Sequence, residues 1–87
     1  MKPSPWRFQM ELIDRQLLIR YMDFRGFSCA SLALRVGCSK ATIGHLRSGY
    51  TSGVRSKKWS DAIERELNVP PGSLFEVKAF RVSENAS

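Results

Sequence analysis

Positively charged side chains gather in the middle of this chain, where their chemistry suits the binding of phosphate. No acidic residue lies between Asp23 and Asp61, whereas this interval holds seven Arg and Lys residues and the whole chain has a net charge of +6. The seven are Arg25, Arg35, Lys40, Arg47, Arg55, Lys57 and Lys58. A charge run is usually a solvated surface, but one that coincides with a phosphate-contacting motif indicates a nucleic-acid partner.

A motif of this kind lies at residues 32–49, LALRVGCSKATIGHLRSG. The apolar residues before Gly37 share one face of a short helix, and glycine allows the left-handed backbone that ends it. Ser39 is suited to cap a second helix, whose inner face has Ile43 and Leu46. Two helices joined by a short turn with glycine form a helix-turn-helix, which places its second helix in the major groove of DNA.

The spacing within this stretch resembles one known family. Leu-Ala is followed by Gly four residues after the Ala, a capping Ser two later, Ile four further on and Gly six beyond that. This order closely resembles the helix-turn-helix of the phage Cro/C1 repressor family, and the resemblance extends over roughly residues 13–75. It implies an all-α fold, a five-helix bundle of the lambda-repressor-like DNA-binding type, and a small Cro-type transcriptional regulator that binds an operator. Repression and activation use the same contacts, so the residues do not distinguish them.

The resemblance assigns base recognition to the outward face of the helix expected at 40–47. Lys40 can donate to the N7 and O6 acceptors of guanine, and the methyl group of Ala41 can contact that of thymine. His45 can donate to guanine or phosphate, or accept from a base amino group. The base-reading set is Lys40, Ala41, Thr42 and His45, with Thr42 nearest to the DNA backbone.

Contacts to the DNA backbone are expected on both sides of that helix. The N-terminus of the preceding helix directs free N–H groups outward beside the hydroxyl of Ser28. The family often pairs an acid at the position of Arg47 with an Arg on the first helix, where this chain has Met22, so Arg47 is expected to be free for a phosphate. Arg55, Lys57 and Lys58 are expected to reach either a phosphate or the minor groove. The backbone-binding set is Ser28, Ser39, Arg47, Ser48, Tyr50, Thr51, Ser52, Arg55, Lys57 and Lys58.

The expected organisation has three parts. Residues 1–10 form an N-terminal arm, residues 11–77 the helix-turn-helix domain, and residues 78–87 a short C-terminal strand or a tail. In the arm, Trp6 and Phe8 either pack back on the domain or contact a partner. Helices are expected at about residues 11–25, 29–36, 40–47, 57–67 and, following Pro70-Pro71, within 71–77.

Other functional classes find little support in the sequence. Cys29 and Cys38 lack the second Cys pair or His cluster of a zinc site, and mostly helical chain between them holds their Cα atoms about 12 Å apart, too far for a disulfide. We expect reduced core thiols. One histidine, no clustered carboxylates and no phosphate-cradling glycine loop predict neither an enzyme nor a cofactor. Without an apolar run long enough to cross a membrane or a signal peptide, a cytoplasmic location in a bacterial host is expected.

The expected partner is double-stranded operator DNA, with no membrane partner. Two copies should occupy two half-sites, because one small helix-turn-helix covers only a few base pairs. In solution we expect a monomer or a weak homodimer, because residues 78–82 offer little apolar area for an obligate interface. The alternative is an antitoxin or adaptor, a protein-interaction module that uses the same fold with DNA binding secondary or lost.

Overall fold

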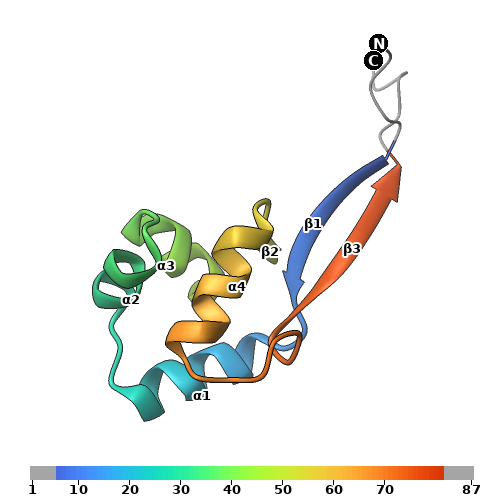
Figure 1. The fold of residues 1–87 in the computed structure, drawn as a ribbon. Coiled ribbons are helices and arrows are strands. Elements are labelled where there is room, and N and C mark those ends of the chain that lie inside the picture. The colour runs from blue at the N-terminus through green and yellow to red at the C-terminus, as the bar shows by residue number, and fades with distance from the viewer. Residues whose placement is uncertain (1–5, 82–87) are drawn as a thin grey trace.

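The computed structural model describes residues 6–81, which form four helices and a three-stranded antiparallel sheet. The helices gather into a compact group, and two long strands leave it side by side as a ribbon (Figure 1). The elements in chain order are β1 (Trp6–Leu12), α1 (Arg15–Arg25), α2 (Cys29–Val36), α3 (Lys40–Ser48), β2 (Gly53–Val54), α4 (Lys57–Glu66) and β3 (Phe75–Arg81).

The sheet corrects the expectation of an all-α five-helix bundle. Its strand order is β2-β1-β3, so the first long strand is central and pairs with the last one. Residues 6–10, expected in an irregular arm, and Glu11 and Leu12, expected to begin the first helix, instead form β1. The helix begins only after Asp14, whose carboxylate accepts the N–H of Gln16. Residues 1–5 and 82–87 of the expected arm and tail lie outside the described residues.

The fifth helix expected within residues 71–77 is absent, and β3 begins in its place at Phe75. The carboxylate of Glu64, on α4, accepts the backbone N–H groups of Gly72, Leu74 and Phe75, each at 3.1 Å. Glu64 is 3% exposed, and its bonds to Leu74 and Phe75 are buried away from water. One buried side chain therefore satisfies three N–H groups of the turn that stands in place of the expected helix, and the chain continues from this turn as a strand.

The register of β1 against β3 gives the ribbon an apolar face. Side chains directly opposite one another in an antiparallel pair lie on the same side of the sheet. At the inner end of this face, Leu12 is half-buried and Phe75 is buried in the core. The cross-strand pairs on this face are Leu12 with Phe75, Met10 with Val77, and Phe8 with Ala79.

The core lies between the helices and the inner end of the sheet. Leu32, Ile43, Leu46 and Ile63 are fully buried, as their helical spacing predicts. Leu74 and Phe75 also close this core as expected, although from a turn and a strand.

Candidate nucleic-acid interface

The turn between α2 and α3 has the structure that the sequence predicts. Gly37 ends α2 with φ of 89°, a left-handed conformation that favours glycine. Its N–H donates to the carbonyl of Ala33 at 2.8 Å. Ser39 then caps α3, because its hydroxyl accepts the N–H of Thr42 at 3.2 Å. These local bonds fix both helix ends, so the direction in which α3 leaves the turn is set by the turn itself.

Burial on one side of α3 leaves the other side open. Ile43 and Leu46 are fully buried, whereas Lys40, Ala41 and His45 are exposed. The structure thus brings three of the four predicted base-reading residues together on one exposed helix face. The fourth, Thr42, is half-buried, and its hydroxyl lies 2.9 Å from that of Ser39 at the helix start.

An aromatic contact supports His45 on this face. Its ring centroid lies 4.7 Å from that of Tyr50, with the two rings tilted by 48°. Tyr50 itself is 78% exposed, in the loop that follows α3. This tilted contact places a second aromatic ring beside the open face of the helix.

Two arginines join the end of α3 to α1, and neither contact was expected from the sequence. Arg15 donates from Nη1 to the carbonyl of Arg47 at 2.8 Å. Arg47 pairs with Asp23 at 3.2 Å and also approaches the sulfur of Met22 at 3.7 Å. The expectation that Arg47 has no ion-pair partner on the first helix is therefore wrong. The position expected to hold the partner is Met22, but the acid, Asp23, lies one residue further along α1. No signal in the sequence pointed to this pair beyond the presence of Asp23 on the same helix, because the contact depends on how α1 and α3 cross.

The loop after α3 keeps the predicted backbone-binding hydroxyls near the helix end. The Ser48 hydroxyl donates to the carbonyl of His45 at 3.3 Å, and the N–H of Thr51 donates to the same carbonyl at 3.2 Å. The Ser52 hydroxyl, in contrast, donates to Glu11 on β1 at 3.4 Å. At the start of α2, the Ser28 hydroxyl is engaged in a capping box with Ser31.

The cations near the start of α4 differ in their surroundings. Lys57 contacts Asp61 at 2.8 Å, and the hydrogen bond and the charge of this carboxylate raise the pKa of the lysine. Arg55 and Lys58 are exposed and have no ion-pair partner within the described part of the chain. In Figure 1 this end of α4 lies on the same side of the helical group as α3.

The remaining features that bear on chemistry are few. Cys29 and Cys38 are free thiols and half-buried, and burial raises the pKa of Cys38. Residues 6–81 hold no cluster of three or more His, Cys, Asp or Glu that could bind a metal ion. Over the same range, no helix has the length and apolar character needed to cross a membrane.

Comparisons with known proteins add no relative to this description. Neither the protein-family models, nor the curated proteins, nor the solved structures yielded a match to this chain.

Proposed function

We propose that this protein is a sequence-specific regulator of transcription that binds double-stranded DNA and inserts α3 into the major groove. The observation that carries the proposal is the exposed face of α3, where Lys40, Ala41 and His45 lie opposite the side that packs on the core. Its inner side is buried in the core, its start is capped by Ser39, and its end is bonded to α1 through Arg15. A major groove admits one helix, and residues near the start of that helix reach the base edges.

Each part of the site has a proposed task. Lys40 and His45 donate to base edges, Ala41 contacts a thymine methyl group, and Thr42 lies at the border with the DNA backbone. Phosphates are bound by the cations at the start of α4 and by the polar residues beside α3. Because Arg47 is paired with Asp23 and half-buried, its task includes holding α3 against α1 as well as approaching a phosphate.

The regulator is proposed to act as two copies on a two-half-site operator, in the manner of a small Cro-type protein of a phage or prophage. Each copy contributes one α3, and half-sites about one helical turn apart bring both helices to the same side of the duplex. The copies associate weakly or only on DNA. The site of action is the cytoplasm of the bacterial host.

A protein-interaction module, such as an antitoxin or adaptor, is the second candidate. One observation favours it: the apolar face of the ribbon continues beyond the core, and Phe8 is 64% exposed there. The seven cations without an intervening acid favour the DNA-binding function instead, because a module that binds only proteins has no need for them.

Selection of bound duplexes from a random DNA library tests the proposal. We expect enrichment of a site with two related half-sites, followed by retardation of that site in the presence of excess random DNA. Lys40→Ala should reduce the preference for the selected site by about 1–3 kcal/mol, whereas Arg20→Ala, on the exposed side of α1, serves as a charge-matched control and should retain the full preference. Failure of the library to converge on any sequence would refute sequence-specific binding.

A further inference from the structure

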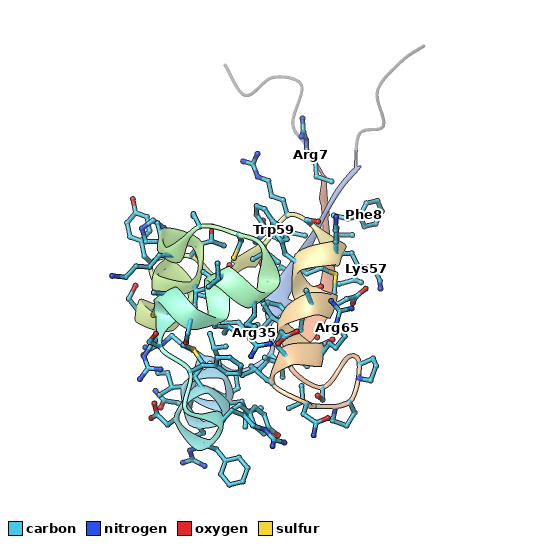
Figure 2. The ribbon with its side chains drawn as sticks, turned by 60° about the vertical axis from the view of Figure 1, so that its left-hand side comes forward. Arg7, Phe8, Arg35, Lys57, Trp59 and Arg65 are labelled. Atoms are coloured by element: carbon cyan, nitrogen blue, oxygen red, sulfur yellow. The ribbon has the colours of Figure 1, made fainter. Side chains whose placement is uncertain are left out.

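The outer end of the ribbon combines exposed apolar side chains with nearby positive charge. Phe8 is 64% and Val77 59% exposed, although both belong to the face that is buried further inward. Figure 2 shows Phe8 on the ribbon close to Lys57 on α4. Between the two elements lies an open groove of about 210 Å³. It is lined by Phe8, Gln9, Met10, Arg55, Lys57 and Val77.

The backbone of β1 has an open edge at this groove. The N–H of Leu12 donates to the carbonyl of Ser52, just before β2, at 2.8 Å. The N–H of Ile13 donates to the carbonyl of Leu74, just before β3, at 2.9 Å. Since successive residues of an antiparallel strand point to opposite edges, the N–H and C=O of Met10 and Phe8 lie on the β2 side. There β2 ends at Val54, opposite Met10. No described strand lies opposite Phe8 on that side, and an open edge of this kind is a template for another strand.

The charges beside the edge limit what can occupy it. Arg55 directly follows β2, is exposed, and has no acid at ion-pair distance among residues 6–81. Lys57 adds a second positive charge, shared with Asp61. A second copy of the chain in this groove would bring the same cations face to face, which is unfavourable. Nucleic acid would leave the apolar surface of Phe8 and Val77 unused. A segment with both apolar and acidic side chains matches the apolar surface of the groove as well as its positive charge.

We propose that the edge of β1 at Phe8 accepts an extended, acidic and apolar segment of a partner protein as an added strand beyond β2. Main-chain hydrogen bonds to Phe8 supply affinity, as in other cases of strand addition, and side chains supply specificity. Apolar side chains of the segment cover Phe8 and Val77, and its carboxylates pair with Arg55. The proposal does not rest on DNA binding, although both interactions give a role to Arg55 and Lys57.

A synthetic peptide of alternating valine and glutamate, labelled for fluorescence anisotropy, is the probe. We expect saturable binding that weakens about tenfold when lysine replaces glutamate in the peptide or when the protein has Phe8→Ser, a loss of about 1.4 kcal/mol. Leu34→Ser is the matched control, because Leu34 is 83% exposed on α2 and does not line the groove. Hydrogen exchange followed by NMR should show slower exchange of the Phe8 amide in the complex, which strand addition requires.

Several outcomes would overturn the proposal. These are the absence of saturable binding at about 1 mM peptide, binding without protection of the Phe8 amide, or equal effects of Phe8→Ser and Leu34→Ser. A chain that sediments as a dimer and dissociates on Phe8→Ser would assign the groove to a second copy instead. If Phe8→Ser does not fold, Val77→Ser tests the same face. Retardation of DNA by these variants is measured in parallel and should be unchanged, which separates this proposal from that of DNA binding.

Discussion

Substitution of Glu64 tests whether its buried carboxylate organises the turn at residues 72–75, which stands in place of the fifth helix expected from the sequence. In Glu64→Gln the side chain keeps its size but presents an NH₂ group toward backbone N–H donors. The carboxylate accepts from three backbone N–H groups, at 3.1 Å each. A hydrogen bond to a charged group contributes about 1.5–3 kcal/mol, and an unsatisfied buried donor costs about 1–3 kcal/mol.

The amide oxygen of the substituted side chain can still accept from one or two of these donors, so the full sum is not lost. We therefore expect the free energy of unfolding to fall by about 2–4 kcal/mol. For a domain of this size, the melting temperature should fall by about 10–20 °C. Urea denaturation followed by circular dichroism measures the first quantity, and a thermal scan measures the second. In addition, amides of β3 should exchange faster, because the turn that precedes the strand loses its anchor.

Glu66→Gln is the control, since it removes the same charge from the same helix at a half-buried position with no hydrogen bond to the described residues. Its effect should stay within about 0.5 kcal/mol. If Glu64→Gln and Glu66→Gln cost the same, the carboxylate does not organise the turn and the reasoning is wrong.

Four further predictions concern DNA binding and the backbone. If about five phosphates are neutralised, the logarithm of DNA affinity should fall with that of salt concentration at a slope near −4 to −5, and a slope near zero would contradict phosphate contacts. Lys40→Ala should weaken binding to the preferred site by about 1–3 kcal/mol and binding to random DNA little, and equal losses on the two DNAs would refute its base-reading role. Lys58→Ala should weaken binding to both DNAs and reduce the salt slope by about one unit. Sedimentation should find a monomer at micromolar concentration, and rising protein should give two retarded DNA bands; a stable nanomolar dimer without DNA would contradict weak association. In urea denaturation, Gly53→Ala should destabilise the fold by about 1–3 kcal/mol, because a Cβ there would overlap the carbonyl oxygen of Met10. Gly44→Ala has no described neighbour within 4 Å of its Cβ and should stabilise the protein by up to about 1 kcal/mol.

The helix-turn-helix could be read from the sequence because its signals are local. Ser28 and Ser39 cap helices through bonds to residues three positions away, and Gly26 and Gly37 end helices by their own backbone conformation. The exposed side of α3 follows in turn from the buried positions of Ile43 and Leu46. Such features need no knowledge of the rest of the chain, so the bounds of α2 and the start of α3 were predicted correctly.

The contacts that hold α3 in place could not be read in this way. Arg15 meets the carbonyl of Arg47 across 32 residues of sequence, and the Asp23–Arg47 pair spans 24. Neither separation follows a regular period of helix or strand, because each contact depends on how α1 and α3 cross. The sequence therefore indicated which residues face outward on α3, but not which ones fix its position.

The sequence offered a C-terminal strand from residue 78 as one alternative, and β3 includes residues 78–81, but the sheet itself was decided by the tertiary structure. β1 alternates apolar and polar residues throughout, and β3 does so from Phe75 to Ala79. A single short alternating segment, however, is stable only when a partner strand completes its hydrogen bonds. For β1 the partner is β3, at the other end of the described chain, and Trp6 pairs with Arg81. Glu64 likewise meets the N–H groups of 72–75 only after α4 has packed on the core. Local chemistry determined α2, the start of α3 and the face proposed to contact DNA, whereas pairing between distant segments determined the ribbon and the groove beside it.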